Sequence, residues 1–311
     1  MKSIGGYFEL VCDKKPLYYQ DGIYLNICRN ALRYIIRALG IKRIHIPFFT
    51  CHVVDEAIQS EGCKILKYNL DKNLLPEQGF PREDFIVYNN YFGVLGQNVE
   101  TLSQIYPNLI VDNAQAFYSK PNCRAVIYSP RKFFGLPDGG ILRGKDIPLL
   151  NLQIGTSTSV ISHLLKRLES GAEAGYKDFV INDSKLDNYP VQSMSELTRA
   201  LMGNIDYEGA KEKRLSNFAF LRQHLKTDFP ILMSMDDVPL VYPLLIENGS
   251  ELRNKLIRNK IFCARYWPNV LDNCKVQSLE YRLANNIVSL PIDQRYGEGD
   301  MSRIISIINQ L

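Results

Sequence analysis

One lysine of the chain stands in a setting that suits covalent amine chemistry. Lys132 lies in the segment 127–140, between the end of an expected strand and a turn rich in glycine and proline, with aromatic residues beside it. Partial desolvation in such a setting disfavours the ammonium form, which a lysine that forms a Schiff base needs. The alternative is a solvated loop lysine, as most lysines are. Ser129 and Arg131 of the same segment can contact a phosphate or simply shape the turn.

Asp112 also suggests cofactor chemistry, because it directly follows the apolar run 109–111. A carboxylate at the end of a strand can pair with a protonated pyridine nitrogen, and this keeps such a ring an electron sink. Gln115, three residues later, can hydrogen-bond the phenolic oxygen of the same ring. The ordinary alternative, which is favoured when Asp112 is taken alone, is an Asp that caps the following turn.

The segment 25–32 opens the first clear helical pattern and contains Cys28, Arg29 and Asn30. Free N–H groups and the dipole at a helix N-terminus favour an anion there, and an arginine can add a bidentate contact to phosphate. Arg29 is therefore a candidate phosphate ligand, and Arg131 is the other. The alternative is a surface helix that begins with polar residues.

Short apolar runs alternate with helical patterns over the first half of the chain, which predicts a parallel sheet with crossover helices. The expected strands are residues 43–47, 64–68, 84–88, 109–111, 125–128 and 139–142, and the expected helices are 30–39, 53–61 and 99–105. Ligands of such sheets bind at the carboxyl ends of the strands, so the three segments named above are expected to share one edge.

The second half of the chain has a different pattern. Helices are expected at 158–170, 195–201 and 207–225, and the polar stretch 177–190 is expected to be irregular. A compact α+β unit is expected to follow, with strands at 238–246, 261–264 and 287–290 and helices at 250–259 and 299–311. We therefore place a large domain at 1–205 and a smaller domain at 206–311. Gly5 and Gly6 are expected to start the first strand, although they can also pack over the mouth of the site.

The composition of the 311-residue chain argues against several function classes. A net charge of +4 with scattered Lys and Arg argues against nucleic acid as the main partner. No apolar stretch reaches the roughly 18–20 residues of a membrane span, and the N-terminus lacks the apolar core of a signal peptide. Seven single cysteines and four dispersed histidines predict reduced thiols, no metal site and a cytoplasmic protein. Neither GxGxxG after a strand nor a P-loop motif is present, so a dinucleotide or P-loop enzyme is not expected.

Taken in chain order, these segments resemble the DegT/DnrJ/StrS family of sugar aminotransferases that depend on pyridoxal 5'-phosphate (PLP). That family has a helix start of small residues, then an Asp with Gln or His three residues on, then a Ser-containing strand that leads to the Schiff-base lysine and a Gly-Gly strand. The similar stretches here are residues 28–32, Asp112 with Gln115, and Ser129 to Lys132 with Gly139-Gly140. Residues 46–50, 90–93, 194–197, 214–217 and 290–301 are similar in the same order, so the likeness spans nearly the whole chain.

The resemblance implies an α/β chain of PLP-dependent transferase fold type I, with a mostly parallel central sheet flanked by helices and a smaller C-terminal α+β domain. It implies that Lys132 holds PLP as a Schiff base and moves protons, and that Asp112 stabilises the pyridinium. The cofactor-binding residues that it implies are Cys28, Arg29, Asn30, His52, Asp112, Gln115, Ser129, Arg131 and Lys132. It further implies a homodimer that passes an amino group from a donor such as glutamate to a nucleotide-linked keto-sugar, typically in polysaccharide biosynthesis.

The sequence departs from the family pattern in several ways. The chain is short, Ser129 stands closer to Lys132 than usual, and Arg29 replaces a small residue. Where many members stack an aromatic ring on the cofactor, this chain has Cys51 or His52, of which His52 can stack and Cys51 can only pack. A sugar dehydratase of the same fold is a second interpretation, although such enzymes typically carry His in place of the lysine. A non-catalytic binding protein on the same fold is the third.

Two further segments keep alternatives open. Residues 266–268, with the sequence Tyr-Trp-Pro, either line the substrate cleft or pack in the core of the smaller domain. The stretch 177–190 either crosses to a partner subunit or is an ordinary exposed loop, and the second is favoured because irregular segments are common on surfaces.

Overall fold

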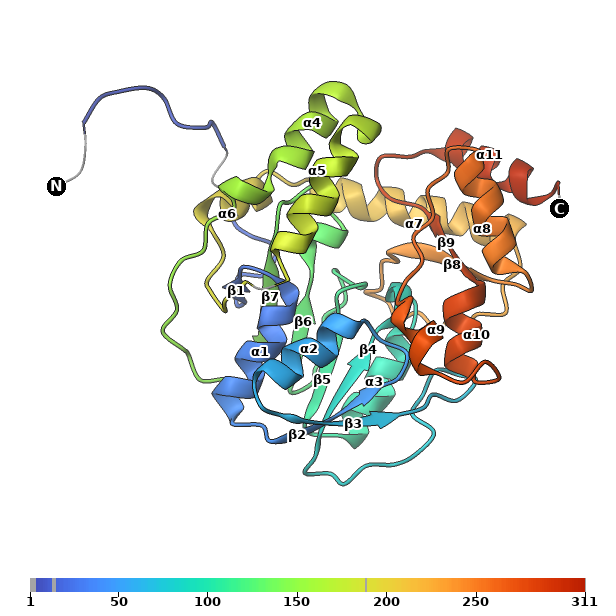
Figure 1. Ribbon diagram of the computed structural model, residues 1–311, viewed down its shortest axis with the longest axis horizontal. Helices are drawn as coiled ribbons and strands as arrows, with labels where there is room; N and C mark the ends of the chain where they lie inside the picture. Colours follow the sequence, from blue (N-terminus) through green and yellow to red (C-terminus); the bar gives the residue numbers. More distant parts are fainter. Residues whose placement is uncertain (1–3, 13–14, 188, 311) are drawn as a thin grey trace.

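A seven-stranded sheet forms the centre of the computed structural model, which describes residues 4–12, 15–187 and 189–310. Its strands run in the order β1 (Ile23–Leu25), β7 (Gly140–Gly144), β6 (Ala125–Tyr128), β5 (Leu109–Asn113), β4 (Phe85–Asn89), β2 (Arg43–Pro47) and β3 (Lys64–Tyr68). The pairs from β3 to β6 are parallel, and β7 is antiparallel to both of its neighbours. The predicted mostly parallel α/β sheet is therefore confirmed (Figure 1).

Each central strand contributes side chains to both faces of the sheet, which is why these strands are continuous apolar runs. In β4, Val87 belongs to the core cluster beneath α1 (Cys28–Leu39) and α2 (His52–Ser60), whereas Ile86 and Tyr88 belong to the cluster on the opposite face. Helix α3 (Gly96–Ile105) covers that opposite face together with part of the C-terminal half of the chain. Helix α1 ends at Gly40, which adopts a left-handed conformation with φ 63°, as its sequence predicts.

Residues 177–185 of the polar stretch are helical, so the prediction of an irregular segment is wrong for them, whereas 186–187 and 189–190 lie outside any helix and residue 188 lies outside the described residues. Helices α4 (Ser162–Ser170) and α5 (Ala172–Lys185) form an antiparallel hairpin that turns at Gly171, where φ is 86°. Lys166 Nζ lies 2.7 Å from Asp178 Oδ1, and Asn182 Nδ2 donates to Ser162 Oγ over 3.1 Å. Contacts with α4 therefore stabilise α5 as a helix, although its sequence has no strong apolar stripe.

The C-terminal half supplies a second, two-stranded sheet beside the first. After the short turn η3 (Thr158–Val160) and the hairpin, its elements are α6 (Glu196–Met202), α7 (Tyr207–His224), β8 (Val241–Leu245), α8 (Gly249–Arg258), α9 (Asn269–Asn273), α10 (Leu279–Asn286), β9 (Ile287–Pro291) and α11 (Glu298–Ile308). Strands β8 and β9 pair antiparallel among α7, α8 and α11 (Figure 1). The predicted helices of this part and its predicted strands at 238–246 and 287–290 are confirmed. The domain boundary near residue 205 stays a prediction. Leu311, the last residue of the predicted final helix, lies outside the described residues.

Two predicted strand positions are wrong. Residues 261–264 form no strand, because no described strand lies beside them to pair with, and Cys263 instead accepts a hydrogen bond from Arg253 Nε over 2.9 Å. Gly5 and Gly6 start no strand either, and the neighbouring side chains of Tyr7 and Phe8 are each 97% exposed. None of the helices in the described part of the chain combines the length and the apolar character needed to cross a membrane.

A buried arginine connects the C-terminal half to the turn that follows Lys132. Arg214 of α7 is only 1% exposed, and it donates to the carbonyl oxygens of Phe133 (3.2 Å) and Leu240 (3.0 Å) and to Gln294 Oε1 (3.0 Å). These hydrogen bonds span segments far apart in the sequence. They therefore hold the lysine-bearing turn against the smaller sheet region.

We expect Arg214→Met to lower the free energy of unfolding by about 3 kcal/mol, because it leaves buried acceptors without a donor. Urea unfolding followed by circular dichroism measures this difference. Arg222→Met, an exposed arginine of the same helix, is the matched control and should change stability by no more than about 0.5 kcal/mol. Equal stability of the two variants would contradict a structural role for the Arg214 contacts.

Candidate active site

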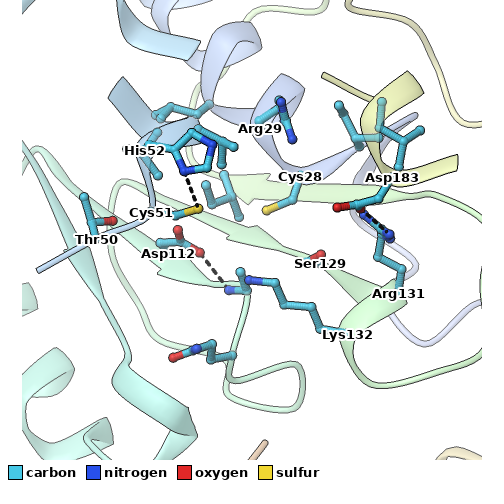
Figure 2. Close-up of a pocket in the computed structure, with 18 of the residues that line it drawn as sticks. Cys28, Arg29, Thr50, Cys51, His52, Asp112, Ser129, Arg131, Lys132 and Asp183 are labelled. Carbon is cyan, nitrogen blue, oxygen red and sulfur yellow. Dashed lines mark hydrogen bonds and ion pairs between the residues drawn. The ribbon is translucent and has the colours of Figure 1, made fainter. Parts of the chain in front are cut away.

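A cavity of about 540 Å³ opens at the carboxyl ends of β4, β5 and β6, next to the N-terminus of α1. The start of α2, with His52, and the end of α5, with Asp183, form part of its wall (Figure 2). Trp267 also lines it. This is the edge at which the sequence predicts a site, because parallel strands direct their carboxyl ends the same way. The cavity therefore gathers residues from widely separated parts of the chain.

Lys132 and Asp112 extend into this same cavity (Figure 2). Asp112 lies near the end of β5, and Lys132 ends the short helix η2 (Pro130–Lys132) that follows β6. Asp112 Oδ1 accepts a hydrogen bond from the backbone N–H of Ala114 over 2.8 Å, which fixes the carboxylate. Burial raises the pKa of Asp112, and the positive charge of Lys132 acts in the opposite direction. An amine and a carboxylate thus share one chamber.

The partial desolvation expected for Lys132 is not seen in this structure, where its side chain is exposed. Among the described residues that line the cavity, Lys132 is the only lysine. No other described lining residue offers a primary amine for covalent chemistry.

The N-terminus of α1 lies at one end of the cavity, where its free N–H groups can bind an anion, and we call this the anion-binding end. Cys28 and Arg29 are its first two residues, and Ile27, the cap residue, offers no side-chain acceptor to the free N–H groups of the first turn. Ser129 at the end of β6 lines the same end and is 5% exposed. Burial raises the pKa of the Cys28 thiol, so Cys28 is neutral at this position.

Two arginines stand beside the anion-binding end, and each is paired with a carboxylate near the end of α5. Arg29 Nη1 lies 3.0 Å from Asp187 Oδ1, and Arg131 Nη2 lies 2.8 Å from Asp183 Oδ1. Both arginines line the cavity, as predicted for phosphate ligands. The carboxylates orient the guanidinium groups, and they could not be predicted because the helix that carries Asp183 was not expected.

Eight of the nine predicted cofactor-binding residues line the cavity, and Asn30 is the exception. The Asn30 side chain is fully buried and donates to Asn26 Oδ1 (2.9 Å) and to the carbonyl oxygen of Pro190 (2.8 Å). The side chain of Asn30 is therefore engaged away from the cavity. Its side-chain amide links α1 to the segment around Pro190. Its backbone N–H belongs to the first turn of α1, at the anion-binding end.

Cys51 and His52 both line the cavity at the start of α2, with Cys51 Sγ 4.0 Å from His52 Nδ1 (Figure 2). Trp267 lines it from the C-terminal half and is also packed edge-on against Phe49, with ring centroids 4.6 Å apart. Trp267 is thus both a core aromatic and part of the cavity wall, while its role toward a substrate stays a prediction. Its φ of 56° is unusual for a non-glycine residue.

Sequence reasoning missed Thr50 and Asn89, which also line the cavity. Asn89 ends β4 and is the register partner of Asp112 in the adjacent parallel strand. A polar residue directly after the expected strand 84–88 was the available signal for it. Phe179 and Val180 of α5 line the opposite wall and had no such signal.

No protein-family model matches the sequence, and a search of curated proteins finds no match. Solved structures do match. The aminotransferase TlmJ from Streptoalloteichus hindustanus superposes with a TM-score of 0.64 at 15% identity, over 93% of this chain and 85% of that one. Spr1654 from Streptococcus pneumoniae, assigned as a sugar aminotransferase and seen in its PLP form, gives 0.62 at 14% identity over 93% and 86%. An aminotransferase of the DegT/DnrJ/EryC1/StrS type from Brucella abortus gives 0.60 at 17% identity over 93% and 85%. The chain therefore has the fold of the DegT/DnrJ/EryC1/StrS aminotransferases.

Proposed function

We propose that this protein is a PLP-dependent aminotransferase. The observation that carries the proposal is the placement of Lys132 and Asp112 in one cavity, with a helix N-terminus at its anion-binding end. An amine, a carboxylate and an anion site are the three groups that a phosphate-bearing pyridine aldehyde requires. Their arrangement on the fold of known aminotransferases supports transamination over other amine chemistry.

The side chains around the cavity suit PLP in chemistry as well as in position. Lys132 would hold it covalently, and Asp112 would pair with the ring nitrogen. The first turn of α1, Ser129 and the two arginines would hold the phosphate. The amide of Gln115 tests independently whether the cavity fits PLP. Its Oε1 accepts a hydrogen bond from the backbone N–H of Phe92 over 2.8 Å, whereas its buried Nε2 has no partner among the described residues. That free donor suits the phenolic oxygen of the ring.

In this proposal, PLP supplies an electron sink that spreads the negative charge formed at the substrate carbon. Once the amine of the donor has displaced Lys132 from its covalent bond, the freed Lys132 Nζ would act as general base toward the proton on the donor's α-carbon and would then deliver that proton as general acid. Asp112 keeps the ring nitrogen protonated through its negative charge. The N–H groups of α1 and Ser129 hold the phosphate, so the reacting atoms stay within reach of Lys132.

Lys132 also favours this function over its alternatives. A sugar dehydratase of the same fold typically carries His at that position, and a non-catalytic binder needs no amine in the cavity. For substrates we propose an amino acid such as glutamate as donor and a nucleotide-linked keto-sugar as acceptor, acting in a homodimer in the cytoplasm. The support for the sugar is the assignment of Spr1654 as a sugar aminotransferase.

A half-reaction experiment tests the proposal. Purified protein incubated with PLP should show a visible absorption band that bleaches on addition of glutamate. After glutamate is removed, 2-oxoglutarate should restore the band, and members of a panel of nucleotide-linked keto-sugars that are substrates should restore it too. Protein that stays colourless with PLP would support the non-catalytic alternative. A band that bleaches with none of the amino acids tested as donors would contradict transamination.

A further inference from the structure

Asn89 carries a buried amide oxygen that no described residue satisfies. Its side chain is 4% exposed, and its Nδ2 donates to Thr50 Oγ1 (2.9 Å) and to the carbonyl oxygen of Phe49 (3.3 Å). A backbone carbonyl can only accept a hydrogen bond, so the NH₂ end of the amide must face Phe49. The free oxygen, Oδ1, is therefore held in a defined direction by these two contacts of the amide nitrogen.

The position of Asn89 places this oxygen beside Asp112. The two residues are register partners in the parallel strands β4 and β5, so their side chains stand next to each other on one face of the sheet. Val87 and Ile110, two residues earlier in each strand, confirm the shared face because both belong to the core cluster under α1 and α2. Both Asn89 and Asp112 line the cavity. Two acceptors thus stand side by side at the end of the sheet.

An acceptor that is buried, oriented and unpaired calls for a donor supplied by a ligand. Asp112 Oδ1 is already committed to the N–H of Ala114, so the other carboxylate oxygen and Asn89 Oδ1 remain for one incoming group. Asn89 Oδ1 differs in this respect from the free group of Gln115, another lining residue, because Gln115 Nε2 is a hydrogen-bond donor and not an acceptor. The ligand edge at Asn89 must therefore carry an N–H or O–H.

We propose that Asn89 Oδ1 is a second acceptor for the N–H of the protonated pyridine ring, beside Asp112, and that Asn89 thereby orients the cofactor. This inference rests on the proposed function and adds a positioning residue to it. Thr50 is the support of that residue, because its hydroxyl holds the amide in place. The proposed contact of Asn89 involves only the ring nitrogen. An experiment that changes this nitrogen can therefore distinguish it from contacts with the phosphate or the phenolic oxygen.

A comparison of PLP with 1-deaza-PLP, in which a C–H group replaces the ring nitrogen, isolates this contact. We expect Asn89→Leu to weaken PLP binding about tenfold, equal to about 1.4 kcal/mol, and to change 1-deaza-PLP binding by less than twofold. Trp267 is the only tryptophan of the chain and lines the cavity, so its fluorescence on titration measures both affinities without any turnover. Circular dichroism establishes that the variant is folded.

Two further variants keep the result interpretable. Thr50→Val removes the hydroxyl that holds the Asn89 amide and leaves β4 unchanged. It should lower the affinity for PLP by less than Asn89→Leu does, and should leave the affinity for 1-deaza-PLP unchanged. It also serves as the test if Asn89→Leu does not fold. Gln115→Leu is the matched control, because both ligands keep the phenolic oxygen and should lose affinity equally. Equal affinity losses of Asn89→Leu for PLP and 1-deaza-PLP, or no loss for either, would overturn the role of Asn89 alone. Wild-type protein that does not bind PLP would overturn the proposed function with it.

Discussion

Replacing Lys132 with alanine is expected to abolish the visible band formed with PLP and to lower the rate of amine transfer by on the order of 10⁴-fold. Lys132 is the only lysine among the residues that line the cavity, so its removal leaves no primary amine there. Neighbouring arginines cannot replace it, because a guanidinium keeps its proton in proteins. The loss should therefore be far larger than the loss from any residue that only holds the phosphate.

The measurement is a visible spectrum with and without borohydride, followed by mass spectrometry of the peptide that contains residue 132. The wild-type protein should carry a reduced pyridoxyl group on this peptide, and Lys132→Ala should carry none. Lys120→Ala is the matched control, because Lys120 is an exposed lysine that lies over the ring of Tyr18 and does not line the cavity. A reducible band that survives in Lys132→Ala would assign the covalent bond to another lysine.

A local sequence pattern predicts a helix or strand when the apolar residues of that element are the ones that become buried. Residues 43–47, 64–68 and 125–128 are strands with the predicted bounds. The clearest case is 125–128, where every residue is buried, because a strand buried on both faces is a continuous apolar run. Helix α5 escapes prediction for the opposite reason. Tyr176, Phe179 and Val180 on it are between 42% and 66% exposed, so no buried stripe reveals its period. Its helical form depends on α4, which a local pattern does not include.

The residues of the site likewise fall into those that a local pattern predicts and those that depend on contacts between distant segments. The position of a residue at a strand end can be read from the sequence, so Asp112 and Lys132 could be assigned to one edge of the sheet. The function of Asn89 depends on its register with Asp112, and register is a property of strand pairing that the sequence of one strand does not contain. Trp267 reaches the same cavity from the other half of the chain. Contacts of this kind arise only when the chain is folded.

Asp112→Asn is expected to lower the rate of amine transfer by on the order of 10²–10³-fold while leaving the borohydride-reducible band in place. Asparagine has nearly the volume of aspartate, and its Oδ1 can still accept from the N–H of Ala114, so the end of β5 should keep its shape. What the variant loses is the negative charge that holds the ring nitrogen protonated. The covalent bond to Lys132 does not need that charge.

Stopped-flow absorbance of the glutamate half-reaction measures the rate, and borohydride reduction measures the amount of bound cofactor in the same sample. Asp183→Asn is the matched control, because Asp183 is another carboxylate at the cavity but is paired with Arg131. Its rate should fall less than about tenfold, since that charge acts through an arginine on the phosphate side. If the two variants lose the same amount of rate, the charge of Asp112 has no special relation to the ring. The assignment of Asp112 to the ring nitrogen would then fail, because only a charge at that nitrogen stabilises the negative charge at the reacting carbon through the ring.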